Sequence, residues 1–209
     1  MYKLYFMPGA CSMAVHVALN EINVPFEIEN VKNSDGSRPK HFLEINNRGN
    51  VPVLTFDKFI LREGAAILIY LLDNHQSNLL PRSGVERAIV LEWLAFANSS
   101  LHPAYSRLFA MHRILADEAP KNKMYDATIA LIQKHWDDIE LNIANKKYLC
   151  LDDCSIADIL ITVIANWSFS FTKPINFGNK TKQLFSNVIS RSSYKKALEV
   201  EGVKYRANK

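Results

Sequence analysis

Short apolar stretches with strand-like spacing recur through the first third of the chain. Residues 2–6 form a compact apolar run, and residues 26–31 alternate apolar and polar positions. Alternation with a period of two is typical of a half-buried strand. Residues 53–56 and 59–61 predict a hairpin around Asp57-Lys58. These two turn residues are unusual for so tight a hairpin, so the sequence leaves the turn type open.

Helical spacing appears between these strands. Residues 11–23 place Val15, Leu19 and Ile22 on one face, and helices are also expected over 40–45 and 64–74. The resulting order is strand-helix-strand followed by helix-strand-strand-helix. This order predicts a mixed sheet with helices packed on it, the thioredoxin-like arrangement.

The rest of the chain has a different pattern. Residues 76–84 are rich in turn-forming residues and predict a linker, after which the strand signal disappears. Helical spacing then returns over 85–115, 125–143 and 156–171. We therefore expect an α/β thioredoxin-like domain over residues 1–75 and an all-α domain over residues 85–209.

Two local signals refine the helical part. Pro103 is expected to bend the first helix, because proline cannot donate a backbone hydrogen bond and clashes with the preceding turn. Ser155 and Asp158 have the spacing of a helix-capping box, which assigns both of them a structural role.

Composition excludes several classes of protein. The 209 residues are 48% hydrophobic and 22% charged with a net charge of +4, and the basic residues are scattered. The sequence lacks a basic patch with interleaved aromatic residues, which would be expected of a nucleic-acid-binding protein. It also has no apolar run long enough for a membrane helix. The first residues lack the features of a signal peptide, so we expect a cytoplasmic protein.

The cysteines indicate neither a disulfide framework nor a metal site. Three cysteines cannot pair completely, and Cys150 and Cys154 lack further ligands at metal-binding spacing. Cys11 differs from them, because it lies at the predicted turn between a strand and a helix. Unpaired N–H groups and the helix dipole there favour a thiolate, so we expect Cys11 to have a lowered pKa. A buried structural cysteine remains the alternative.

Two further positions could complete a binding cleft. Val51-Pro52 precedes a strand, where a cis proline would expose the backbone groups of Val51, although an ordinary trans proline is more frequent. Glu63-Gly64 opens a helix whose N–H groups could hold a carboxylate. The Glu63 carboxylate itself either interacts with the positive end of the helix dipole or pairs with an ammonium group. Such a cleft would suit a small zwitterionic thiol peptide.

Several motifs resemble the bacterial beta-class glutathione transferases, over nearly the whole chain. They are Tyr5-Phe-Met-Pro-Gly-Ala-Cys-Ser12, Phe42-Leu-Glu-Ile-Asn46, Gly49-Asn-Val-Pro-Val-Leu54, Arg62-Glu-Gly-Ala-Ala-Ile67, Glu92-Trp-Leu94, Leu101-His102, Ser155-Ile-Ala-Asp158 and Asn166-Trp167. The resemblance implies the glutathione transferase fold, glutathione as co-substrate without a metal, and a homodimer.

The resemblance also implies roles for individual residues. Cys11 matches the active-site cysteine, which can form a mixed disulfide with glutathione, and His102 matches a histidine that faces the thiol. Val51, beside Pro52, matches the residue that pairs with the cysteinyl part. Glu63 and Gly64 match the site of the γ-glutamyl group.

Departures from the family pattern fall in the same region. Phe6 stands where many members have tyrosine, Pro103 where many have lysine, and Ala95 at the position of an asparagine that can touch the cysteine. The loop that carries a lysine for the glycyl carboxylate is shortened, which leaves Arg38 or Lys40 as candidates.

Three functions follow as hypotheses. The first is conjugation of glutathione to hydrophobic electrophiles in detoxification, with Tyr105, Phe109 and Trp167 lining the electrophile pocket, although core or interface packing is the more frequent role of such aromatic residues. The second is glutathione-dependent thiol–disulfide exchange or reduction through Cys11. The third is a non-catalytic stress or regulatory protein that uses the fold for binding.

Overall fold

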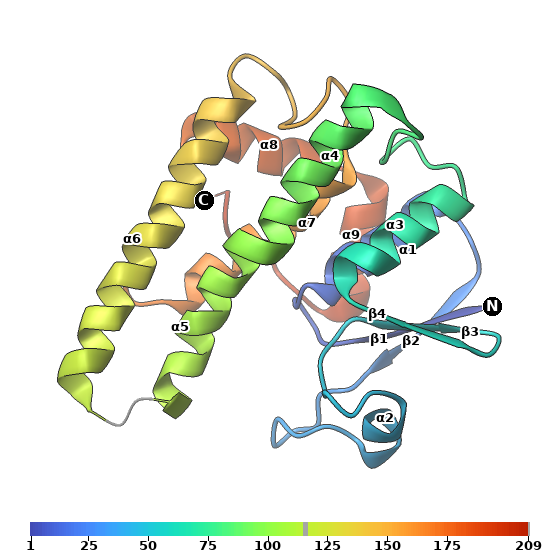
Figure 1. The fold of residues 1–209 in the computed structure, drawn as a ribbon, viewed down its shortest axis with the longest axis horizontal. Coiled ribbons are helices and arrows are strands. Elements are labelled where there is room, and N and C mark those ends of the chain that lie inside the picture. The colour runs from blue at the N-terminus through green and yellow to red at the C-terminus, as the bar shows by residue number, and fades with distance from the viewer. Residues whose placement is uncertain (115–116, 209) are drawn as a thin grey trace.

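The computed structural model describes residues 1–114 and 117–208, and its first part is a four-stranded mixed sheet (Figure 1). The strands are β1 (Tyr2–Phe6), β2 (Phe26–Asn30), β3 (Val53–Phe56) and β4 (Phe59–Arg62), in the order β2-β1-β3-β4. β1 runs parallel to β2 and antiparallel to β3, and β3 pairs antiparallel with β4. Asp57 takes a φ of 50° in the hairpin, a conformation that aspartate tolerates better than most residues.

Helices cover both faces of this sheet. The helices are α1 (Ser12–Ile22), α2 (Lys40–Ile45) and α3 (Gly64–Asn74). Leu4 and Leu54 belong to the main core with α1 and α3, whereas Tyr5 and Val53 pack with Phe42 of α2. Neighbouring residues of one strand point to opposite faces, so this division follows from the period of two. Together with the helical part below, it confirms the predicted thioredoxin-like and all-α fold.

The remainder of the described chain is helical. It contains α4 (Gly84–Phe96), α5 (His102–Ile114), α6 (Glu118–Ile143), α7 (Ile156–Ala165), α8 (Asn179–Ile189) and α9 (Ser192–Glu201). Every residue of α7 is buried, and α7 packs against α1, α4 and α8. Within the described ranges, no helix combines the length and the apolarity needed to cross a bilayer.

The helix that contains Pro103 does not simply bend. Residues Ala97–Leu101 form one turn of π-helix, which separates α4 from α5. A proline would clash with the carbonyl four residues earlier in a regular α-helix, and a π turn relieves this by displacing those carbonyls. The third expected helix also ends early, since α7 stops at Ala165 and Asn166–Ser170 form a 3₁₀ turn.

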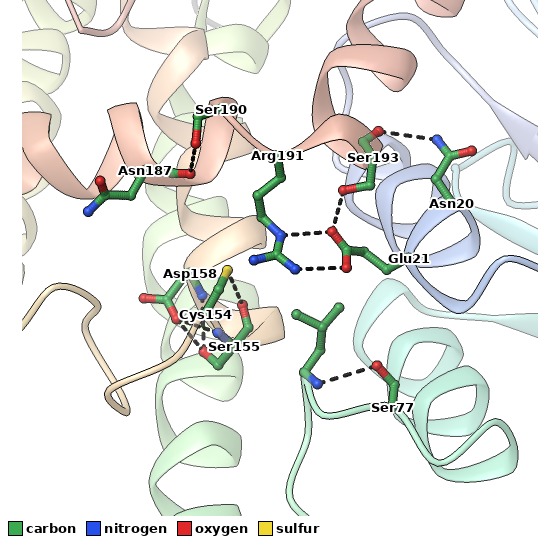
Figure 2. A network of polar contacts seen from close by, with 11 residues as sticks. Asn20, Glu21, Ser77, Cys154, Ser155, Asp158, Asn187, Ser190, Arg191 and Ser193 are labelled. Carbon is green, nitrogen blue, oxygen red and sulfur yellow. Dashed lines mark hydrogen bonds and ion pairs between the residues drawn. The ribbon is translucent and has the colours of Figure 1, made fainter.

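The capping box before α7 is confirmed (Figure 2). The Asp158 carboxylate accepts hydrogen bonds from the N–H and hydroxyl of Ser155 at 2.8 and 2.6 Å, and from the N–H of Leu149 at 2.8 Å. Burial nevertheless raises the pKa of Asp158. These bonds fix the start of α7 against the segment that precedes it.

The two parts of the chain are joined where α1 meets α9 (Figure 2). Arg191 donates from Nε and Nη2 to the two carboxylate oxygens of Glu21 at 2.7 and 2.8 Å. Ser193 donates to the same carboxylate, and Asn20 donates to the Ser193 carbonyl at 3.2 Å. These bonds hold α1, the helix that follows Cys11, against the helical part.

Candidate active site

A cavity of about 920 Å³ lies between the sheet and the helical part. The loop that ends β1, the Val51-Pro52 segment and the start of α3 form one wall, and α5 with the turn after α7 forms the other. Among the residues expected to form the site, the lining contains Cys11, Val51, Pro52, Glu63, Gly64, Arg38, His102, Phe109 and Trp167.

Cys11 lies immediately before α1 and is partly exposed to this cavity. Its Sγ donates a hydrogen bond to the Val51 carbonyl at 3.4 Å. Burial raises the pKa of Cys11 to about 11, against the smaller lowering effect of the N–H groups of Ser12 and Cys11. The expected lowered pKa is therefore wrong for the protein without ligand, because loss of solvation outweighs the helix start.

Alkylation of Cys11 should therefore rise about tenfold for each pH unit between pH 7 and 10, since only the thiolate reacts. We still expect Cys11 to be labelled first, because burial raises the pKa of Cys150 further, to about 12, and also that of Cys154. Peptide mapping after brief iodoacetamide treatment measures both effects. A rate that levels off near pH 8, or equal labelling of all three cysteines, would contradict this interpretation.

The Val51-Pro52 peptide bond is cis, although a trans bond is the more frequent form before proline. Both residues line the cavity, and Val51 already accepts the hydrogen bond from Cys11 through its carbonyl. A Cβ added to Gly64 would lie 3.5 Å from the Pro52 ring, which is ordinary contact. The start of α3 is thus directly against the cis proline, so a ligand on the Val51 backbone lies near the first N–H groups of α3.

Glu63 precedes α3 with a φ of 69°, and its side chain makes no capping hydrogen bond. Instead, the carboxylate is exposed and pairs with Arg48 at 3.1 Å. Both alternatives for Glu63 stay open, because it lies directly before α3 and its carboxylate also pairs with a cationic side chain. Gly64 begins the helix, so its N–H is one of the groups without an intrahelical partner.

Arg38 and Lys40, the two candidates for the glycyl carboxylate, differ in position. Arg38 lines the cavity. Its Nε donates a hydrogen bond to the Gly49 carbonyl at 2.9 Å, and its Nη1 donates to the Gly36 carbonyl at 3.0 Å. Lys40 is exposed at the start of α2 and is not part of the lining. The structure thus brings only Arg38 to the cavity.

Three other cationic residues of the lining escaped the sequence analysis: Lys32, Arg48 and Arg62. Scattered basic residues carry no periodic signal, so only the fold shows that these three share a wall. Arg62 donates to the Ile45 carbonyl at 2.5 Å, and no ion pair within the described residues joins it to a carboxylate. The wall beside the sheet is therefore positively charged.

His102 begins α5 on the opposite wall. Its Nδ1 lies 3.1 Å from the Ser106 hydroxyl, and its ring meets the edge of Trp167 at a centroid distance of 5.0 Å. Burial lowers the pKa of His102, so the imidazole is neutral near neutral pH. A neutral imidazole can donate a hydrogen bond or accept a proton.

Tyr105 does not line the cavity, contrary to the sequence expectation. It is fully buried, with its hydroxyl 2.6 Å from that of Ser168 and accepting from Trp136 Nε1 at 2.8 Å. An aromatic residue one turn along the helix from His102 points into the helical core instead. Phe109 is 43% exposed and reaches the cavity beside Trp167.

Asn98 is a polar residue of the lining that the sequence pattern did not single out. The sequence places Ala95 at the position of the family asparagine, but the structure places Asn98 in the lining. Asn98 lies four residues before His102, and together with Ser106 and Phe109 these residues follow one helical face along the cavity, so helical spacing counted from His102 could have indicated Asn98. Phe6 is buried and, like Tyr5, is not in the lining.

Among the residues that the structure describes, no group of three or more His, Cys, Asp or Glu side chains is arranged to hold a metal ion. The cavity instead combines a thiol, an exposed backbone edge, a helix start and a neutral histidine. Together with the fold, this defines a two-part protein in which a thioredoxin-like unit and a helical unit share one cleft.

Comparison with known proteins identifies the family. Residues 1–73 match the model of the glutathione S-transferase N-terminal domain. Glutathione S-transferase GST-4.5 of Xanthomonas campestris is 28% identical, with 96% of this chain and 99% of that protein covered.

Two solved structures extend this similarity over the chain. A bacterial glutathione transferase, BphK, solved as a ternary complex, is 31% identical with a TM-score of 0.83, over 96% of this chain and 100% of that one. The beta-class enzyme of Sphingomonas chungbukensis is 28% identical with a TM-score of 0.80, over 97% and 100%. The chain belongs to the glutathione S-transferase family, and its resemblance to the bacterial beta class is confirmed.

Proposed function

We propose that this glutathione S-transferase adds the thiol of glutathione to hydrophobic electrophiles, with Cys11 as the active-site thiol. The observation that carries the proposal is that one cavity contains Cys11, Val51, Gly64 and His102 together. The Val51 backbone would pair with the cysteinyl part, and the start of α3 with the γ-glutamyl carboxylate. Arg38 would hold the glycyl carboxylate at the other end.

Cys11 would act on the glutathione sulfur as a neutral donor. With a pKa of about 11 it is protonated near neutral pH, and its S–H can donate to a thiolate as it donates to Val51 in the free protein. The glutathione thiol would release its proton to solvent or to His102. The sulfur then forms a bond to carbon while a leaving group departs with its electron pair, and the donors stabilise the thiolate.

The opposite wall is uncharged. Its described lining includes Phe109, Leu160, Trp167 and Val203 beside polar residues such as Ser106, and no Lys, Arg, Asp or Glu belongs to it. Positive charge lies on the wall proposed for glutathione, so a neutral apolar substrate fits the remaining space best. Incubation with glutathione and 1-chloro-2,4-dinitrobenzene tests this; formation of the aryl conjugate no faster than in buffer would contradict conjugation of such electrophiles.

Among the residues of the helical wall, we expect His102 to make the most important hydrogen bond to the glutathione sulfur. Replacing it with alanine should lower kcat for this electrophile about fivefold, because one hydrogen bond to the reacting sulfur contributes about 1 kcal/mol. Tyr5→Phe is the matched control, since Tyr5 lies outside the cavity. Steady-state kinetics and melting temperatures of both variants measure the effect. Loss of activity in Tyr5→Phe but not in His102→Ala would show that the site is misassigned.

Thiol–disulfide exchange through Cys11 is a second candidate, and one observation favours it. Cys11 is the single cysteine of the described cavity lining, which suits a monothiol route through a glutathione mixed disulfide. Thiolate of Cys11 would attack oxidised glutathione and release one glutathione molecule. Mass spectrometry of the protein with and without reductant detects this adduct, and a non-catalytic binding protein would show neither adduct nor turnover.

The family resemblance supports three broader proposals. We propose that residues 1–75 bind glutathione and residues 85–209 supply the electrophile pocket, with 76–84 as the linker. We also propose a homodimer and a detoxification role in the cytoplasm. Light scattering on the purified protein measures the oligomeric state directly.

A further inference from the structure

The backbone N–H and carbonyl of Gly9 both bond to the helical part of the chain. Gly9 lies in the loop between β1 and α1, two residues before Cys11, with a φ of 68°. Its N–H donates to Glu201 Oε2 at 2.9 Å, and its carbonyl accepts from Trp167 Nε1 at 2.7 Å. The two partners come from the end of α9 and from the turn after α7.

Glu201 is well fixed for this contact. Its side chain is fully buried, and its other oxygen lies 2.9 Å from Nδ1 of His16, which is buried in α1. A buried carboxyl group without hydrogen bonds is costly, so each of these contacts restrains the others. Glu201 therefore connects α9, α1 and the loop before Cys11.

The loop transmits this restraint to the thiol. The Ala10 N–H donates to the Met7 carbonyl at 3.1 Å, and the Met13 N–H donates to the Ala10 carbonyl at 2.9 Å. Gly9 also packs closely, since a Cβ there would lie 3.5 Å from Val203. Gly9, Cys11, Trp167 and Val203 all line the cavity, so a displacement of the Gly9 backbone would change the wall that contains the thiol.

We propose that Glu201 is a positioning residue that, together with the indole N–H of Trp167, clamps the backbone of Gly9 and thereby sets the place of Cys11 in the cleft. The importance of that placement for turnover rests on the proposed function, but the clamp itself does not. Glu201 acts through the loop and is not itself in the cavity lining.

Iodoacetamide labelling of Cys11 in the full chain, without glutathione, tests the clamp. Glu201→Ala and Trp167→Phe each remove one partner of the Gly9 backbone. Each should raise the labelling rate about fivefold at constant pH, the equivalent of one hydrogen bond of about 1 kcal/mol, because the loop releases the thiol from its contact with Val51. Glu201→Gln retains an acceptor for the Gly9 N–H and should restore labelling to nearly the wild-type rate.

Glu21→Gln is the matched control. It disturbs another carboxylate between α1 and the α9 region, the partner of Arg191, without contact to Gly9. A general loss of stability would increase labelling in this variant as well. Labelling in Glu201→Ala and Trp167→Phe that is indistinguishable from Glu21→Gln would overturn the proposal; if Glu201→Ala does not fold, Trp167→Phe decides. Because no glutathione is present, the outcome is independent of whether the protein conjugates electrophiles.

Discussion

Replacing Glu63 with alanine is expected to weaken glutathione binding by about tenfold or more. Glu63 is at the cavity rim with an exposed carboxylate, and its present partner, Arg48, is also solvent-exposed. In the proposed complex this carboxylate pairs with the γ-glutamyl ammonium group. A hydrogen bond to a charged group contributes about 1.5–3 kcal/mol, and losing it lowers the affinity for glutathione about tenfold or more.

Calorimetric titration of glutathione measures the effect of Glu63→Ala. Glu44→Ala is the matched control, because Glu44 is an exposed glutamate on α2 that lies outside the cavity lining and the variant has the same net charge. Equal affinities in the two variants would remove Glu63 from the binding site.

Asp158→Ala should lower the free energy of unfolding by about 3 kcal/mol. Three donors would lose their acceptor: the Leu149 N–H, the Ser155 N–H and the Ser155 hydroxyl. Each buried donor left unpaired costs about 1 kcal/mol or more, even though burial of the carboxylate itself is unfavourable. Denaturant unfolding followed by circular dichroism measures this difference.

Asp152→Ala controls for the loss of an acidic residue in the same segment, since Asp152 is exposed. The control should unfold at nearly the wild-type denaturant concentration. An Asp158→Ala variant as stable as Asp152→Ala would show that the capping box contributes little.

Sequence patterns predicted the sheet part well because its signals are local. The strand at residues 2–6 and the helices at 40–45 and 64–74 have the bounds that the structure shows. In each case strand alternation or helical spacing coincides with a turn signal. The helices α8 and α9 were not predicted, although the buried residues Leu184, Phe185 and Val188 of α8 lie at helical spacing on one face.

Features that depend on the tertiary structure could not be predicted in this way. The helix start at Cys11 correctly indicated its place, but its pKa is set by burial, which involves residues distant in sequence. Tyr105 lies in the core and not in the cavity lining, because the packing of α5 decides which of its faces meets the cleft. The Glu201 contact with Gly9 joins residues 192 positions apart and has no local signal.

A crystal structure of the protein with glutathione tests the central proposal most directly. We expect the cysteinyl backbone to pair with Val51, the γ-glutamyl carboxylate to accept the Gly64 N–H, and the glutathione sulfur to lie within hydrogen-bond distance of Cys11 Sγ. Glutathione bound elsewhere, or with its sulfur directed away from Cys11, would contradict the proposed site.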